Sequence, residues 1–308
     1  MNCTSCPRHC EADRVGVLGF CQATNTVEVS AVCRHTGEEP PLTGKSGVCN
    51  VFFAHCNLQC EYCQNYQISR GILDAGLVRI ASMDELVEAV LRMLPQTENV
   101  LGLVSPSHYA EHIPELIERI HQRGFQPTVV YNSGGYDDAE VLKRLEPWVD
   151  VYLPDLKYAD SRLAADLSHA ADYPEKAGKA LKEMYRQKGS SLITDDNEVA
   201  QSGMIIRHLV LPGMVENSLH VLDWIADNIS TNIHISLMAQ YCPTEGALSQ
   251  EILKRYPQLN RTLREEEYDE VVEHYYDLGF HKGWVQELKS AQNYNPDFCS
   301  EHEMFLEK

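Results

Sequence analysis

The sequence lacks the long hydrophobic runs and the excess of basic charge that would point to a membrane or to nucleic acid. No apolar stretch approaches the length of a bilayer span, and residues 1–6 have neither the basic start nor the apolar core of a secretory signal. With 26 Lys and Arg against 45 Asp and Glu, the formal net charge is −19, which repels phosphate backbones. We therefore expect a cytoplasmic protein with no membrane and no nucleic-acid partner.

Core-forming residues, in contrast, are not scarce. Hydrophobic residues make up 44% of the 308 positions and charged residues 23%, as in ordinary globular proteins, which excludes disorder as the main state. A chain of this length buries enough surface for one large domain or two smaller ones without a disulfide scaffold.

The eleven cysteines are odd in number and unevenly distributed. Without an export signal the compartment is expected to be reducing, where dense cysteine indicates metal or redox chemistry rather than disulfides. Nine of the eleven fall within residues 1–63, so we expect that chemistry in the first part of the chain.

Apolar runs and helical patterns alternate over residues 47–241. The expected strands are Val48–Ala54, Val100–Val104, Thr128–Tyr131, Val149–Leu153, Met204–Leu211 and Ile233–Met238. The expected helices are Ser82–Leu94, Ile113–Arg123, Ala139–Leu145, Pro174–Lys188 and Ser218–Asn228. Ser82 is an expected N-cap, with Glu85 completing a capping box. The alternation predicts an α/β fold, a partial (β/α)6 TIM-like barrel of parallel strands; pattern alone leaves a doubly wound sheet open.

The chain divides into two parts in this prediction. Residues 1–46 form a small Cys-rich metal-binding module, and residues 47–308 form the barrel with a C-terminal helical tail that includes Arg264–Leu278. The first part has turn residues and little periodicity, so a metal rather than a core is expected to hold it together. Its four thiols suit zinc, a single iron or an auxiliary cluster that relays electrons or binds a partner. This second metal site is predicted at Cys3, Cys6, Cys10 and Cys21, with Cys33 or Cys49 as replacements for one of them.

The sharpest motif is Cys56-x3-Cys60-x2-Cys63, with Tyr62 just before the last cysteine and an apolar strand just before the first. Thiolates suit iron–sulfur clusters. Three protein ligands leave one iron of a cubane open, and an open position is what a catalytic metal site needs. The alternative is a zinc knuckle that a histidine such as His55 completes.

This loop resembles the signature of the radical S-adenosylmethionine (SAM) enzymes, and the wider chain is similar to the PflX-type subgroup related to pyruvate formate-lyase-activating enzyme. The blocks that carry the wider resemblance are Gly37–Pro41, Phe52–Cys56, Cys63–Asn65, Tyr152–Tyr158, Arg207–Gly213 and Ser236–Tyr241. The resemblance implies a 4Fe-4S cluster on Cys56, Cys60 and Cys63, with SAM chelating the open iron. One electron then cleaves SAM to methionine and a 5′-deoxyadenosyl radical, which takes a hydrogen atom from the substrate.

The expected SAM site combines the cysteine loop with the carboxyl ends of the strands, where the chemistry of parallel barrels gathers. By resemblance, Tyr62 would lie against the adenine and Asn65 would help to fix the loop. The predicted strand-end contacts are Ser105, Ser107, Asn132, Ser133, Asp155, Lys157, Arg207, Gln240 and Tyr241.

Several of these residues have two interpretations. Asp155 and Lys157 share one face of their strand, so the lysine either neutralises the SAM carboxylate or forms a structural ion pair. Arg207 either binds a carboxylate bidentately or braces the barrel. At Ser105–Ser107 the chain departs from the family's Gly-Gly-Glu-Pro segment, and Asn132 stands where the related activating enzyme has an aspartate.

The leading functional hypothesis is a radical SAM enzyme that takes its electron from a donor such as flavodoxin or ferredoxin and installs a glycyl radical on a partner protein. A second hypothesis keeps the radical chemistry with a peptide or small-molecule substrate. A third is a zinc-dependent binding protein without catalysis. Fold analogy does not choose among substrates.

Overall fold

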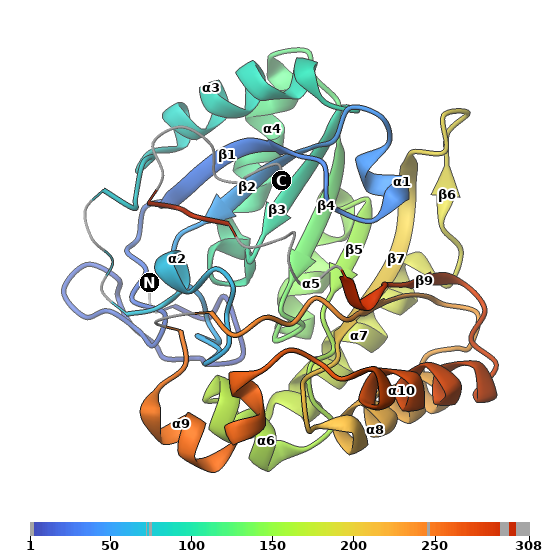
Figure 1. Ribbon diagram of the computed structural model, residues 1–308. Coiled ribbons are helices and arrows are strands. Elements are labelled where there is room, and N and C mark those ends of the chain that lie inside the picture. The colour runs from blue at the N-terminus through green and yellow to red at the C-terminus, as the bar shows by residue number, and fades with distance from the viewer. Residues whose placement is uncertain (1–2, 72, 74–75, 245–246, 290–295, 300–308) are drawn as a thin grey trace.

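The structure is a computed structural model that describes residues 3–71, 73, 76–244, 247–289 and 296–299. Its centre is one sheet (Figure 1), whose strands are β1 (Val29–His35), β2 (Val48–Phe53), β3 (Val100–Val104), β4 (Thr128–Ser133), β5 (Val151–Pro154), β6 (Ile193–Thr194), β7 (Ala200–Leu209), β8 (His234–Met238) and β9 (Gly283–Val285). The neighbours run in the order β1-β2-β3-β4-β5-β7-β8-β9, and β6 pairs with β7.

The sheet is mostly parallel. Each neighbouring pair from β2 to β9 along this path is parallel, whereas β1 is antiparallel to β2 and β6 is antiparallel to β7. The parallel strands follow one another in chain order, as in an incomplete barrel, whereas a doubly wound sheet reverses its order at a switch point. The α/β prediction is confirmed.

All six expected strands are present, but the parallel part of the sheet has one strand more than the six that were predicted. The additional parallel strand is β9, which has three residues and is too short to show a period. A further strand, β1, lies inside residues 1–46 and joins the main sheet through β2. Residues 3–28 before it contain no helix or strand in the described part of the chain.

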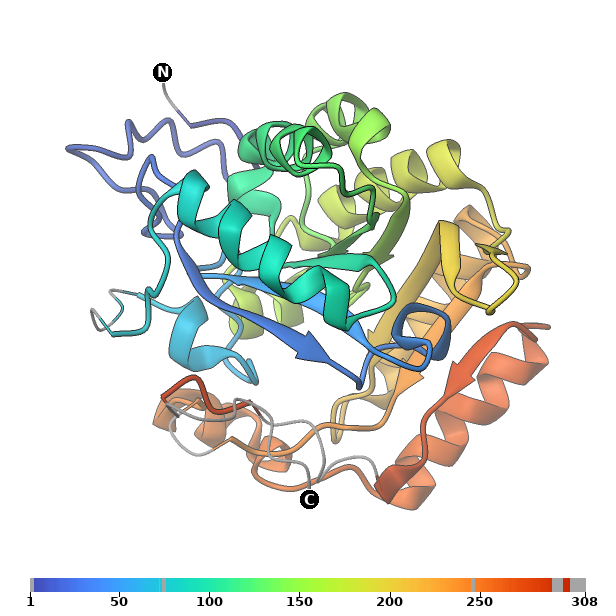
Figure 2. The ribbon, with the colours of Figure 1, turned by 90° about the horizontal axis from the view of Figure 1, so that it is seen from above.

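Helices cover the outer side of the curved sheet (Figures 1 and 2). They are α3 (Met83–Met93), α4 (Ile113–Gln122), α5 (Ala139–Leu145), α6 (Ser161–Ser168), α7 (Tyr173–Lys188), α8 (Val215–Asn228) and α10 (Glu265–Asp277). The short helix α9 (Gln250–Arg255) lies beside α6 (Figure 1). The Ser82 side chain accepts a hydrogen bond from the Glu85 amide, so the predicted N-cap is confirmed. None of the described helices is both long and apolar enough to cross a membrane.

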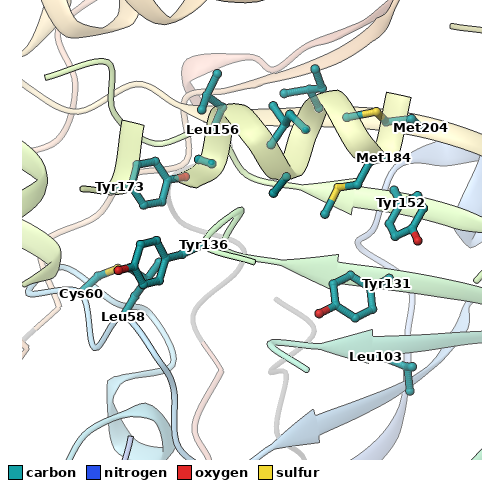
Figure 3. Close-up of a cluster of buried hydrophobic side chains, with 14 of the residues drawn as sticks. Leu58, Cys60, Leu103, Tyr131, Tyr136, Tyr152, Leu156, Tyr173, Met184 and Met204 are labelled. Atoms are coloured by element: carbon teal, nitrogen blue, oxygen red, sulfur yellow. The ribbon is translucent and has the colours of Figure 1, made fainter. Parts of the chain in front are cut away.

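The outer face of the strands packs against these helices because alternate side chains point to opposite faces of a strand. Leu103, Tyr131, Tyr152 and Met204 project from neighbouring strands into a buried layer with Met184 of α7 (Figure 3). The inward-facing residues between them are therefore free to line the interior of the barrel.

The interior has an apolar end and a polar end. Short helix α1 (Pro40–Thr43) places Leu42 against Val48, Val100, Val130 and Val151, which lie near the amino ends of their strands. Burial of these branched side chains closes that end of the barrel. The carboxyl ends of the strands, in contrast, bear the polar side chains that the sequence singled out.

The loop after β4 needs glycine at position 135. Gly135 has φ +76°, and a Cβ there would collide with the Asp155 carbonyl oxygen. We expect Gly135→Ala to lower the free energy of unfolding by at least about 2 kcal/mol more than Gly124→Ala, because overpacking adds to the left-handed backbone cost of about 1–2 kcal/mol. Gly124 has φ +86° with nothing near its Cβ direction. Equal losses in urea unfolding would contradict the close approach.

Candidate active site

A cavity of about 440 Å³ occupies the polar end of the barrel interior. Most of the sequence-predicted site residues face it. Those that line it are Cys56, Cys60, Tyr62, Cys63, Asn65, Ser105, Asn132, Ser133, Asp155, Lys157, Arg207 and Gln240. Residues far apart in the chain thus meet because their parallel strands end at the same edge of the sheet.

The three cysteine sulfurs of the loop after β2 each have a hydrogen-bond donor. The Leu58 amide lies 3.4 Å from the Cys56 sulfur. The Ser168 hydroxyl donates to the Cys60 sulfur at 3.0 Å, and the Ser69 hydroxyl lies 3.4 Å from the Cys63 sulfur. Donors aimed at sulfur favour its anionic form, which is the form that binds metal.

The loop is held in its shape by backbone conformation and by one guanidinium. His55 and Gln59 have φ +69° and φ +55°, left-handed values that let a short loop turn tightly. Arg70 donates from Nε to the Cys60 carbonyl at 3.1 Å. The His55 ring is buried and its Nε2 lies 3.4 Å from Glu28, an arrangement that directs it to that carboxylate.

The electrostatics of the loop suit a cationic centre. Burial raises the pKa of Cys56 to about 12, and it also raises the pKa of Cys60, against the attraction of Lys157. A buried thiol therefore stays protonated until a positive charge arrives, and a coordinating metal ion supplies one. The three cysteines and their surroundings therefore fit a 4Fe-4S cluster in which one iron has no protein ligand.

A buried row of hydroxyl groups joins the expected adenine contact to the cysteine loop. The Tyr158 hydroxyl lies 2.8 Å from the Tyr62 hydroxyl and 2.7 Å from the Ser168 hydroxyl, which in turn donates to Cys60. Ser168 is fully buried at the end of α6. The sequence analysis missed Tyr158 and Ser168 as site residues, because nothing local in the sequence marks a serine that comes close to a cysteine through the fold.

Lys157 and Asp155 form an ion pair at the end of β5. Burial opposes the charge of Lys157, but attraction to Asp155 and Cys60 outweighs it, so the pKa of the lysine is raised. The lysine is a fixed cation between the cysteine loop and the acidic side of the cavity.

Arg207 of β7 contacts three carboxylates of its own chain. Its nitrogens lie 3.1 Å from Glu38, 3.7 Å from Glu39 and 3.5 Å from Asp155. This is the bracing arrangement of the two that we considered. Glu38 and Glu39 precede α1 and were quoted in the sequence only as part of a family block. The sequence does not show that these two glutamates are buried against Arg207, so it could not single them out as site residues.

Ser105 adopts φ +55°, a left-handed conformation that favours glycine, at the place where the family has glycines. Its amide donates to the Asn132 carbonyl at 2.8 Å, which joins the ends of β3 and β4. The Gln240 side chain accepts a hydrogen bond from Gln286, a residue that follows β9, at 2.9 Å. Ser105, Asn132 and Gln240 thus lie on separate walls of one cavity.

Three predicted contacts have other partners. Ser133 lines the cavity, but its hydroxyl donates to Asp137 at 2.5 Å. Ser107 is buried and hydrogen-bonds with the same carboxylate, outside the cavity lining. Tyr241 is buried away from the lining, and its hydroxyl donates to the Leu259 carbonyl at 2.6 Å.

The N-terminal cysteines are not assembled as a single-ion site. Cys3, Cys6 and Cys21 are buried and Cys10 is exposed. Across the described ranges, no group of three or more His, Cys, Asp or Glu side chains is placed to hold one metal ion. The cavity cysteines are included in that finding, but a cubane binds its three sulfurs through three different irons, so its ligands need not converge on one point.

Comparison with known proteins identifies the family. Residues 50–225, more than half of the chain, match the Radical SAM superfamily. The chain belongs to this superfamily. Membership implies an enzyme of radical chemistry that uses a 4Fe-4S cluster and SAM, and the matched range contains the cysteine loop and the polar ends of β3, β4, β5 and β7.

Relatives of this radical SAM protein are distant. An uncharacterized protein of Methanocaldococcus jannaschii is 28% identical over 276 residues, which cover 88% of this chain and 73% of that one. The 7-carboxy-7-deazaguanine synthase of Methanopyrus kandleri is 26% identical over 168 residues, 49% of this chain and 63% of its own. The structure of Streptococcus suis SuiB bound to S-adenosylmethionine has a TM-score of 0.50 at 12% identity over 77% of this chain and 50% of that chain, a similarity of fold alone.

Arg207 provides a stability test of the cavity. We expect Arg207→Met to lower the free energy of unfolding by about 3–5 kcal/mol at pH 8, because it leaves buried carboxylates unpaired. Burial already raises the pKa of Glu39 and Arg207 lowers it, so the variant raises it further. A folded-state pKa above the unfolded value means that stability falls as pH rises, and the loss should therefore be smaller at pH 5.5.

The matched control is Arg119→Met, which removes exposed ion pairs to Asp84 and Glu115 and should change the free energy of unfolding far less than Arg207→Met at both pH values. Denaturant unfolding at pH 5.5 and pH 8 measures all of these quantities. A loss in Arg207→Met that is the same at both pH values would refute the role of the buried carboxylates.

Proposed function

We propose that Cys56, Cys60 and Cys63 hold the 4Fe-4S cluster of this superfamily member and that the cavity beside them holds SAM. The observation that carries the proposal is that three cysteines, each with a hydrogen-bond donor at its sulfur, line one cavity. With the cofactors bound, one electron splits SAM into methionine and a 5′-deoxyadenosyl radical, and that radical takes a hydrogen atom from the substrate to become 5′-deoxyadenosine. The electron comes from a low-potential carrier such as flavodoxin or ferredoxin.

The residues of the chain position and shield these groups. Lys157 is proposed to neutralise the SAM carboxylate, and its ion pair with Asp155 holds it in place. Tyr62, buried on the cavity wall, is proposed to pack against the adenine. Asn65 and Asn132 offer amide groups to the polar part of SAM. Closure of the far end by α1 keeps water from the reacting atoms.

The N-terminal segment, residues 1–46, is proposed to carry a second metal on Cys3, Cys6, Cys10 and Cys21 as a structural site. Three of the four thiols are buried, and the buried guanidinium of Arg14 is attracted to Cys3 and Cys21. An auxiliary cluster suits these four thiolates as they are placed, because it binds them through different irons, whereas zinc or a single iron would require the four sulfurs to move together.

The substrate is proposed from resemblance alone. The leading candidate is a glycyl-radical partner protein, as for the activating enzymes that the cysteine loop and the other blocks resemble. A peptide or small molecule is the alternative within the same chemistry. Genomic neighbours and co-purifying proteins are the observations that distinguish them.

The cysteine assignment can be tested by substitution. Cys56→Ala, Cys60→Ala and Cys63→Ala should each reduce 5′-deoxyadenosine formation more than 100-fold, because a cubane with two protein ligands is not retained. Chromatography after anaerobic reconstitution and dithionite reduction measures the product. Cys299→Ala, an exposed cysteine, is the control and should match the wild type. Preserved SAM cleavage in any of the three variants would remove that residue from the ligand set.

Ser168 offers a test of the surroundings of the cluster. Its hydrogen bond to the Cys60 sulfur stabilises the more negative, reduced state, and hydrogen bonds to sulfur set cluster potentials. We expect Ser168→Ala to lower the midpoint potential by about 40 mV, the one-electron equivalent of a hydrogen bond of about 1 kcal/mol. Spectroscopic redox titration measures it.

The control for Ser168 is Ser191→Ala, which removes an exposed hydroxyl and should leave the potential unchanged. Iron content should match the wild type in both variants. A potential that does not move in Ser168→Ala would show that this serine does not act on the cluster.

A further inference from the structure

The acidic side of the cavity has more carboxyl groups than cationic side chains. Among the described residues that line the cavity, Glu38, Glu39 and Asp155 supply three carboxylates, and Lys157 and Arg207 supply two cations. The carboxylate in excess has no cation of the chain to itself. A buried charge without a partner is costly, so this balance suits a ligand that brings a positive charge.

Two carboxylate oxygens of this region lack hydrogen bonds. Glu39 has a side chain that is only 6% exposed, and its Oε2 is buried without a hydrogen-bond partner in the described part of the chain. The same holds for Oδ1 of Asp155. Both carboxylates lie within 4 Å of the Arg207 Nε, so they face one region of the cavity.

Glu38, the residue before Glu39, has a hydrogen-bond partner for each of its carboxylate oxygens. Its Oε1 accepts a hydrogen bond from Asn50 at 2.9 Å and its Oε2 accepts one from Arg207 at 3.1 Å. Asn50 itself fits because Gly102 of β3 has no side chain, and a Cβ there would collide with the Asn50 amide. Glu38 thus has a partner for each carboxylate oxygen, whereas Glu39, which also lines the cavity, has one buried oxygen without a hydrogen bond in the described part of the chain.

We infer that Glu39, with Asp155, binds a primary ammonium group of the substrate. The inference rests on the proposed function and names a substrate class for the same cavity. An ammonium is a compact cation with three donors, enough for the two oxygens that lack a hydrogen bond. A neutral hydroxyl donates once and leaves the excess charge uncompensated.

The ionisation of Glu39 agrees with such a ligand. Burial raises its pKa, which favours a proton on the carboxyl when the cavity holds no cation. An ammonium beside it favours the ionised form instead.

SAM has an ammonium of its own, so the source of the cation has to be distinguished. In the proposed site that ammonium would be held with the cluster of Cys56, Cys60 and Cys63. Figures 1 and 2 both show α2 (Tyr66–Ser69), which follows the cysteine loop, apart from α1, which follows Glu39. Glu39 is the residue just before α1, and titration with and without SAM distinguishes a substrate ammonium from that of SAM.

The test compares two probes of equal carbon number on reconstituted enzyme. Ligand-observed NMR titrations with n-butylammonium and with n-butanol are run with and without saturating SAM. We expect n-butylammonium to bind at least tenfold more tightly than n-butanol in both conditions. Equal affinities for the two probes would overturn the inference, and loss of the preference once SAM is bound would assign the carboxylates to SAM rather than to a substrate.

Two isosteric variants locate the effect. Glu39→Gln should weaken n-butylammonium binding at least fivefold, and Glu38→Gln, which removes the same charge from a carboxylate with both oxygens engaged, should weaken it less than twofold. Equal weakening in both would show a general effect of charge and would refute the contact with Glu39.

The wild-type enzyme separates this inference from the proposed function. SAM cleavage without selectivity for the ammonium probe refutes the inference alone. Selective binding of the probe without SAM cleavage refutes the proposed function alone.

Discussion

The ion pairs of Arg207 hold the interior of this protein together. One guanidinium on β7 joins the segment before α1, through Glu38 and Glu39, to the end of β5, through Asp155. Because these groups lie inside the barrel, each depends on the others to offset its loss of water. The position of Lys157 depends on the same set through Asp155, so the shape of the cavity and its electrostatics have a common origin.

The cysteine loop depends on that arrangement from the opposite side. Lys157 attracts the Cys60 sulfur electrostatically, and Ser168 donates a hydrogen bond to it from α6. The loop thus receives donors from elements that are distant in sequence, which are fixed only when the barrel is complete. Folding of the barrel and readiness of the sulfurs for metal are therefore coupled.

Sequence patterns predicted the repeated part of the fold well and its additions poorly. The strands and helices of the barrel follow from apolar runs and from caps such as Ser82, which are local signals. Strand β9 has three residues, and β1 lies in a segment dominated by cysteine and turn residues, so neither shows a period. Most of the predicted site residues line one cavity. They could be predicted because the end of an apolar run marks the end of a strand, and the ends of parallel strands lie together. Glu39 and Ser168 were missed because their importance comes from burial and from distant partners.

The pairing of β1 with β2 ties the cysteine-rich part of the chain to the barrel. The hydrogen bonds of that antiparallel pair cover one edge of β2 from Val48 to Phe53, and Leu42 seals the amino end of the barrel from the same stretch of chain. A fragment that started at residue 47 would have an open strand edge and an unfilled apolar hole, the two features that make isolated sheets aggregate. The stretch that contains β1 and α1 is therefore part of the barrel structure. A soluble catalytic core obtained by truncation would have to retain both elements.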